Sequence, residues 1–173
     1  MAHQPTPQQQ LFSAFADLLR YPAGDATSLA RRCHALLRDR DAAATLDGFT
    51  RHAERAAPHE LEELYAATFD LDPACAPYVG HHLCGDGPQR GVFLSRLTEV
   101  YRKDGFAVAA PDGELPDHLT VVLGYLATVA EGADRQALLD DALVPALDRM
   151  LGALEEPGNA YRAVLSALRK EVA

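Results

Sequence analysis

Two short stretches of this sequence hold side chains that could do chemistry. The first, residues 70–91, contains two cysteines and two adjacent histidines: Cys75, His81, His82 and Cys84. The second, Glu114-Leu115-Pro116-Asp117-His118, places a carboxylate beside an imidazole at the head of an apolar run. Imidazole, thiol and carboxylate groups can bind metal ions, catalyse reactions or form charge-assisted hydrogen bonds with a partner. Their spacing decides which of these chemistries is open to the chain.

The spacing of the histidines and cysteines does not fit a standard metal site. Zinc sites bring three or four ligands together, commonly from closely spaced pairs. Neighbouring residues of a helix point about 100° apart, so His81 and His82 cannot easily share one ion. His81 and Cys84 are three residues apart and could do so, but a second ligand pair is missing from the sequence. We therefore expect no metal and no cofactor, and histidines that are partly buried and hydrogen-bonded.

Nucleophilic catalysis is the alternative from a different functional class. It needs a base beside the nucleophile and a site that stabilises an oxyanion. The sequence has no Gly-x-Ser-x-Gly elbow, P-loop or Gly-x-Gly-x-x-Gly stretch. A small metal- or thiol-dependent hydrolase that uses Cys84, His81 and His118 stays open as the alternative. Our prediction is that the chain has no catalytic residues and is not an enzyme.

The composition is that of an acidic globular protein. Its 173 residues suit one domain, and 48% hydrophobic with 24% charged residues is the ordinary range. The formal net charge of −9 disfavours nucleic acid and anionic lipid and favours a cationic partner. The sequence contains no secretion signal and no apolar stretch long enough for membrane insertion. Three cysteines without a Cys-x-x-Cys pair suggest free thiols, so we expect a cytoplasmic protein.

Helical spacing dominates the chain, and no alternating strand pattern is found. Apolar residues recur at three- and four-residue steps in stretches beginning near residues 11, 29, 42, 58, 89, 119, 134 and 161. Pro145 should kink or restart the helix that contains it. These patterns predict an all-α, single-domain bundle of about seven to nine helices. We expect residues 1–10 to be a flexible N-terminus and residues 11–173 to form the helical domain.

Irregular segments separate the candidate residues from these helices. Proline and glycine between residues 70 and 91 predict a turn, a short helix over about 78–83 and a tight turn at 85–88. A loop over residues 106–113 leads to Pro116, which suits the first turn of the next helix.

Asp117 is electrostatically favourable beside the N-terminus of that next helix, so its presence has a structural explanation. His118, at the mouth of an otherwise apolar helix, has none. Together the two residues could offer an acceptor and a switchable donor to a peptide backbone or an arginine.

Five stretches resemble a known protein family in both order and spacing. They are residues 63–70 (ELYAATFD), 78–86 (YVGHHLCGD), 89–91 (QRG), 101–105 (YRKDG) and 114–119 (ELPDHL). The chain resembles the cytoplasmic chaperones of molybdenum oxidoreductases, the NarJ-, TorD- and DmsD-like redox enzyme maturation proteins. This resemblance runs from about Leu11 to the C-terminus and implies a single bundle of helices.

The resemblance also implies a partner and a binding site. Such chaperones bind the N-terminal peptide, a twin-arginine signal or its remnant, of the catalytic subunit of a DMSO reductase-type molybdenum oxidoreductase, and hold that subunit until its cofactor is inserted. The family's Pro-Asp-His stretch lies at the peptide groove. The peptide-binding residues implied here are Tyr78, His82, Asp86, Arg90, Glu114, Pro116, Asp117 and His118. The segment 73–77 and the histidine pair differ from those of nitrate reductase chaperones, which leaves the client enzyme open.

We expect a groove between residues 78–90 and the helix that follows Glu114, which accepts an amphipathic, helical peptide. Asp117 and Asp86 would select a basic peptide, with an arginine bound bidentately to Asp117. Arg90 either pairs with Asp86 or faces solvent. The sequence leaves open whether the chain forms a homodimer.

Overall fold

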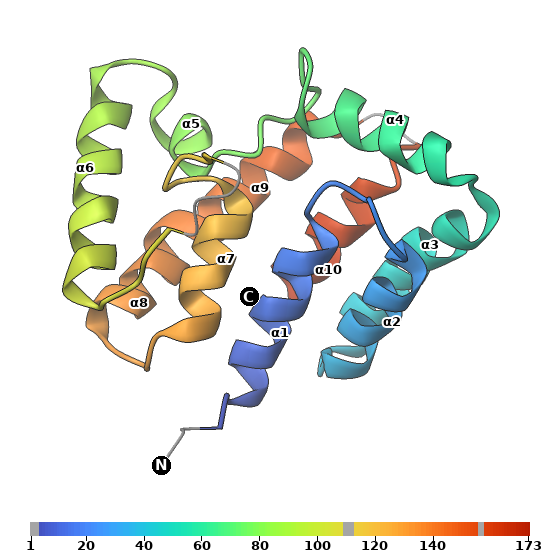
Figure 1. Ribbon diagram of the computed structural model, residues 1–173, viewed down its shortest axis with the longest axis horizontal. Coiled ribbons are helices and arrows are strands. Elements are labelled where there is room, and N and C mark those ends of the chain that lie inside the picture. The colour runs from blue at the N-terminus through green and yellow to red at the C-terminus, as the bar shows by residue number, and fades with distance from the viewer. Residues whose placement is uncertain (1–3, 109–112, 156–157) are drawn as a thin grey trace.

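The computed structural model describes residues 4–108, 113–155 and 158–173. Its helices are α1 (Pro7–Leu18), α2 (Ala26–Leu36), α3 (Arg40–Arg55), α4 (Pro58–Phe69), α5 (Val79–Cys84), α6 (Pro88–Lys103), α7 (Leu119–Thr128), α8 (Ala133–Ala137), a π-helical segment η1 (Leu138–Leu143), α9 (Val144–Ala153) and α10 (Tyr161–Glu171) (Figure 1). The segments α8, η1 and α9 follow one another without a break, so they form one rod. With α1–α7 and α10 this makes nine helical rods, and the predicted all-α fold is confirmed.

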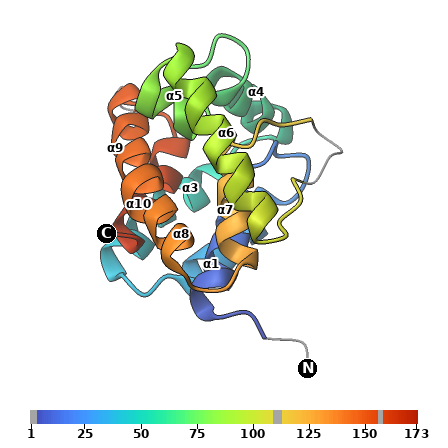
Figure 2. The same ribbon diagram turned by 90° about the vertical axis from the view of Figure 1, so that its left-hand side faces the viewer.

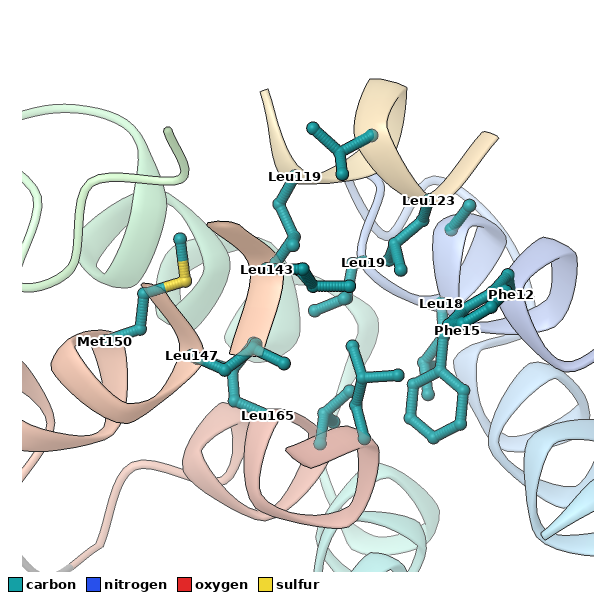
Figure 3. Packing of buried hydrophobic residues seen from close by; sticks show 14 of the residues in the cluster. Phe12, Phe15, Leu18, Leu19, Leu119, Leu123, Leu143, Leu147, Met150 and Leu165 are labelled. Atoms are coloured by element: carbon teal, nitrogen blue, oxygen red, sulfur yellow. The ribbon is translucent and has the colours of Figure 1, made fainter. Parts of the chain in front are cut away.

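The core lies where α1 meets its neighbours. Helix α1 packs against α7 and α2, while α10 packs against α3 and α9. Side chains from α1, α7, η1, α9 and α10 interdigitate at the centre of the bundle (Figure 3). Phe12, Phe15, Leu123, Leu147 and Leu165 are all fully buried there. Each large apolar side chain removed from water contributes about 1.5–3 kcal/mol, so this cluster fixes the arrangement of the helices.

The first helix begins earlier than the apolar pattern indicates. The Thr6 hydroxyl accepts a hydrogen bond from Gln9 N (3.2 Å), and Gln9 Oε1 accepts one from Thr6 N (2.8 Å). This reciprocal capping starts the helix at Pro7. Residues 7–10, which were expected to belong to a flexible N-terminus, form the first turn of α1, and residues 1–3 lie outside the described ranges.

The composite rod restarts at the predicted proline. Pro145 lies in the first turn of α9, directly after the wider π-helical turns of η1. Since proline has no N–H to donate, a local change of hydrogen-bond pattern accommodates it. Upstream, Arg135 is buried; its guanidinium donates to Leu126 O (3.2 Å) and Gln8 Oε1 (2.9 Å). These bonds tie the start of the rod to α7 and α1.

Helices α5 and α6 form a hairpin at one side of the bundle. In Figure 2, α6 runs along the near face, in front of α7. Helix α5 packs against α9, α6 and η1. Arg149 of α9 donates to the carbonyls of His82 and Leu83, the latter at 3.0 Å, and so caps the C-terminal end of α5. Within the described ranges, no helix is both long and apolar enough to cross a membrane.

Candidate functional site

The two stretches singled out in the sequence lie side by side. Val79 N donates to Asp117 O (2.8 Å), and Leu119 N donates to Pro77 O (2.8 Å). These bonds make an isolated antiparallel bridge between Tyr78 and His118. The bridge joins the start of α5 to the start of α7 and so brings the two stretches into contact.

His118 is the N-cap of α7. Its Nδ1 accepts a hydrogen bond from Thr120 N (3.2 Å), which places the proton of the neutral ring on Nε2. That nitrogen faces Glu114 Oε2 at 3.9 Å. Burial lowers the pKa of His118 below its usual 6.5, although the carboxylates of Glu114 and Asp117 oppose this effect. The ring is therefore a neutral helix cap whose Nε2 edge points toward the Glu114 carboxylate.

Pro116 does not lie in the first turn of α7, as the sequence suggested. The helix begins at Leu119, so Pro116 precedes the N-cap by two residues and sits in a turn. Its carbonyl accepts a hydrogen bond from the hydroxyl of Tyr101 (2.9 Å), which anchors the turn to α6. The expectation failed because a proline before a helix and one inside its first turn look alike in sequence.

Asp117 is fully buried and already has partners. Its Oδ2 accepts from Gly80 N (3.1 Å) and from Arg90 Nε (3.2 Å). Arg90 also donates to Asp86 Oδ1 (3.1 Å), and its guanidinium carbon lies 5.1 Å from the centre of the Tyr78 ring. An arginine does bind Asp117, but it belongs to this chain. The role predicted for Asp117, a direct ligand of a peptide arginine, does not fit this arrangement.

Gly80 makes the close approach of Asp117 to α5 possible. A Cβ at this position would lie 2.6 Å from Asp117 Oδ2 and 2.8 Å from Phe93 Cδ1. Any other residue would push Asp117 away from the backbone N–H of residue 80. Gly80 could not be identified from the sequence, because a glycine inside a helix does not indicate which neighbouring side chain packs against its backbone.

An open groove runs between α4 and α7. Its volume is about 610 Å³. We call it the aromatic groove, and its aromatic, apolar and charged lining includes Arg20, Tyr21, Tyr65, Phe69, Asp70, Tyr78, Phe106, Glu114, His118, Val121 and Gly124. The predicted groove between residues 78–90 and α7 is misplaced, since the bridge and the Arg90–Asp117 pair hold those segments together.

Three of the eight predicted site residues line the aromatic groove. Tyr78, Glu114 and His118 form one wall. The other five predicted residues, His82, Asp86, Arg90, Pro116 and Asp117, do not line it. The opposite wall comes from α4 and from the turn after α1, and none of its residues was among the predicted site residues. The aromatic residues of α4 were a usable signal, because an amphipathic helix near an irregular segment can border a pocket.

Three large exposed apolar side chains belong to the groove or to residues next to its lining in the sequence. Tyr21, Leu71 and Leu115 are 51%, 79% and 43% exposed. Tyr21 lines the groove itself, while Leu71 and Leu115 directly follow the lining residues Asp70 and Glu114. Apolar side chains gathered around a hollow, unlike scattered ones, are typical of a surface that binds another protein.

The aromatic groove carries a negative charge from two of its lining residues, Asp70 and Glu114. Glu114 Oε2 accepts a hydrogen bond from the Tyr78 hydroxyl (3.3 Å). Burial, then Glu114 and Asp70, raise the pKa of Tyr65 to about 12. Among the described residues, neither carboxylate forms an ion pair with a lysine or arginine, and Arg20 of the groove pairs with Asp17 (3.9 Å). The two carboxylates are therefore open to a cation from a partner.

The alternative hydrolase site is not assembled in this structure. His81 Nδ1 pairs with Asp86 Oδ1 (2.7 Å), and His118 Nδ1 is occupied by Thr120. Within the described part of the chain, the Cys84 thiol forms no hydrogen bond with either histidine. Residues 4–108, 113–155 and 158–173 contain no group of three or more histidine, cysteine or acidic side chains that could hold a metal ion.

A different thiol does lie near a histidine, but it is not activated. Cys75 Sγ is 4.0 Å from His82 Nε2. That nitrogen is also 2.7 Å from the carbonyl of Ala76, to which it donates its proton. Burial raises the pKa of the Cys75 thiol to about 12 and lowers the pKa of His82. Cys75 is thus a protonated core thiol without a base.

Comparison with known proteins identifies the family. Residues 36–166 match the family model described as nitrate reductase delta subunit. The "Nitrate reductase-like protein NarX" of Mycobacterium tuberculosis is 33% identical over 151 residues, which cover 87% of this chain; the chain spans only 22% of that relative's length. The "Probable nitrate reductase molybdenum cofactor assembly chaperone NarJ" of Bacillus subtilis is 29% identical over 172 residues, which cover 88% of this chain and 92% of the relative.

A solved structure shares the fold. It is described as a redox enzyme maturation protein from Archaeoglobus fulgidus, and it superposes with a TM-score of 0.67 at 21% identity, covering 98% of this chain and 96% of that one. At this identity the likeness concerns the fold alone. The family model, by contrast, covers most of the sequence and confirms the resemblance found in the motifs. The chain belongs to the nitrate reductase delta subunit family, which includes the NarJ-type assembly chaperones.

Proposed function

We propose that this chain is a cytoplasmic assembly chaperone that binds the N-terminal peptide of the catalytic subunit of a molybdenum oxidoreductase and holds it for cofactor insertion. Family membership supports the chaperone role and agrees with the prediction that the chain is not an enzyme. The three free cysteines suit a reducing compartment. The observation that carries the proposal is the aromatic groove, an open hollow lined by aromatic rings and by two carboxylates that form no ion pair with any lysine or arginine of the described ranges.

Burial of apolar side chains would supply most of the binding free energy. Tyr21, Tyr65, Phe69 and Phe106 offer rings on which an amphipathic helix can lay its apolar face. Each large side chain that the peptide buries contributes roughly 1.5–3 kcal/mol. After the ordering costs of the peptide, two or three such anchors give an affinity in roughly the micromolar to nanomolar range.

Charge would select among apolar peptides. Asp70 and Glu114 replace Asp117 and Asp86 as the proposed acceptors, because they line the aromatic groove and have no lysine or arginine partner there. A peptide arginine beside them would also lie near the rings of Tyr65 and Tyr78, where cation–π attraction adds to the ion pair. Charge-assisted contacts of this kind increase specificity and the rate of encounter more than the affinity itself.

Arg90 and Asp117 are proposed to act indirectly. Neither residue of this ion pair lines the aromatic groove, but the Arg90 guanidinium carbon lies 5.1 Å from the centre of the Tyr78 ring, which does. The pair fixes the orientation of that ring, so we regard both as positioning residues rather than peptide ligands.

Titration calorimetry with the N-terminal peptide of the molybdenum-enzyme subunit from the same cell tests this proposal. Asp70→Asn/Glu114→Gln should weaken binding roughly tenfold, because two favourable charge contacts are lost. The same change should have little effect on a peptide whose arginines are replaced by glutamine. Glu63→Gln/Asp141→Asn removes two exposed carboxylates outside the aromatic groove and serves as the control. Equal affinity of all three proteins for the unmodified peptide would place the site elsewhere.

A further inference from the structure

A second open hollow lies in the angle between α3 and α4. Its volume is about 620 Å³, and we call it the basic hollow; its lining is Gly48, Arg51, His52, Arg55, Ala56, Glu60 and Leu64. It shares no lining residue with the aromatic groove. The two surfaces use different faces of α4, since Tyr65 and Phe69 border one and Glu60 and Leu64 border the other.

The basic hollow is positively charged on a chain whose formal net charge is −9. Arg51 and Arg55 lie one helical turn apart, both are exposed, and neither forms an ion pair with any described residue. Two of the three acidic residues of α3 have partners: Glu54 pairs with Arg31 (2.6 Å) and Asp47 with His34 (3.4 Å). The carboxylate of Glu60 is occupied as well, because it accepts Ala57 N (2.7 Å) at the start of α4.

Helix electrostatics explain only part of this pattern. His52 and Arg55 belong to the last turn of α3, where a positive charge is favourable at the negative end of the helix dipole. Arg51 precedes that turn, and the partly buried Leu64 on α4 adds an apolar contact point. The same negative helix end disfavours a small free anion, which would have to sit against it.

We propose that the basic hollow docks an acidic helical segment of a partner protein. Two carboxylates one turn apart on that segment face Arg51 and Arg55, and an apolar side chain between them meets Leu64. The angle between two helices accommodates a third helix, and guanidinium groups bind carboxylates in a bidentate geometry. A foreign segment fits better than a second copy of this chain, because two molecules of charge −9 repel each other.

The probe for this proposal is a fluorescent, alanine-rich helical peptide with glutamates one turn apart and one leucine between them. Fluorescence anisotropy measures its affinity for the full chain. Arg51→Glu/Arg55→Glu should weaken binding at least roughly tenfold, because two attractions become repulsions. A matched peptide with lysine in place of glutamate should bind this double variant more tightly than it binds the original chain, in which the aromatic groove is the same.

The control is Arg96→Glu/Arg162→Glu, which changes the net charge equally at two exposed arginines that lie outside the basic hollow and have no ion pair with described residues. It should retain near-original affinity for the acidic peptide. Equal loss in both double variants would attribute binding to overall charge and overturn the proposal. Sedimentation velocity adds a second criterion: if the charge reversal instead alters self-association, the occupant is another copy of this chain and the proposal is wrong.

Discussion

At the scale of single residues, Asp117 connects three parts of the chain. Its carboxylate accepts hydrogen bonds from the backbone N–H of Gly80 in α5 and from the guanidinium of Arg90 in α6, while its backbone carbonyl accepts one from Val79 N. Taking two charges out of water is costly, so such a pair adds little stability in comparison with an apolar substitute. Removing one partner is different, because the remaining charge is left buried.

Arg90→Ala should therefore destabilise the protein strongly. The Asp117 side chain has no exposure, and the Arg90 side chain has only 18%. Breaking such a pair costs roughly 3–5 kcal/mol, which urea denaturation would detect as a lower midpoint. Arg102→Ala, on the same helix, removes an exposed pair with Glu99 and should cost less than about 1 kcal/mol. Similar midpoints for the two variants would show that the Asp117 pair does not hold the hairpin in place.

The sequence identified the side chains that could bind a metal, catalyse a reaction or form ion pairs, but not which contacts each of them makes in the folded chain. It correctly brought residues 78–90 and 114–118 together, and it included Arg90–Asp86 pairing among the alternatives for Arg90. It could not show that Arg90 also reaches Asp117, because this contact depends on the absence of a Cβ at Gly80. The burial of Asp117 results from the packing of the helices and produces no local pattern in the sequence.

At the scale of elements, α7 contributes to both the core and the aromatic groove. Leu119, Leu123 and Leu126 face the interior, while Val121 and Gly124 line the groove. A Cβ added at Gly124 would meet only the Phe106 ring, at an ordinary 3.7 Å. The groove therefore has room at this position because the side chain is missing, not because the backbone requires a glycine.

Gly124→Leu should block the aromatic groove without unfolding the helix. The leucine would occupy space in the groove that the peptide needs, so affinity for the client peptide should fall at least roughly tenfold. Replacing a glycine in the middle of a helix stabilises the helix, and this gain offsets part of any steric destabilisation. Calorimetry with the client peptide and thermal unfolding of the free protein measure the two effects separately. Gly152→Leu, on an exposed part of α9 with open space around it, is the control. Undiminished affinity of the Gly124 variant would mean that the peptide lies elsewhere.

Helix positions were largely predictable, and the errors have physical causes. The proline at the start of α4 and the proline-directed restart at α9 were both recognised from local sequence. The start of α1 was missed because its capping residues are polar and lie before the apolar pattern. The wall that α4 contributes to the aromatic groove was missed, because apolar spacing does not distinguish a side chain facing the core from one facing a pocket. Residues 109–112 of the predicted loop lie outside the described ranges.

At the scale of the whole molecule, the buried His118 and the half-buried His82 link stability to pH. Burial lowers the pKa of both His82 and His118 from 6.5 in the folded chain. As the pH falls, the unfolded chain therefore takes up these protons first. Their contribution to the free energy of unfolding is complete above about pH 6.5 and is lost as the pH falls toward the lower pKa values of the folded state.

Urea titrations between pH 7.5 and 5.5 should show this decline in the free energy of unfolding. His118→Asn should make the decline shallower, because asparagine also caps helices but does not titrate. His59→Asn, at an exposed position of α4, should retain the full slope. A protein that became more stable as the pH fell through this window would contradict the assignment of neutral, buried rings.

The burial of the cysteines has a practical consequence. Cys33 and Cys75 are sealed in the interior, and burial raises the pKa of each thiol to about 12, whereas Cys84 is partly accessible at the end of α5. A maleimide dye added to the native protein would accordingly attach at one point without any prior mutagenesis. That point lies on the hairpin that the Arg90–Asp117 pair joins to the 114–118 turn, so the dye's emission would report whether Arg90→Ala displaces the hairpin.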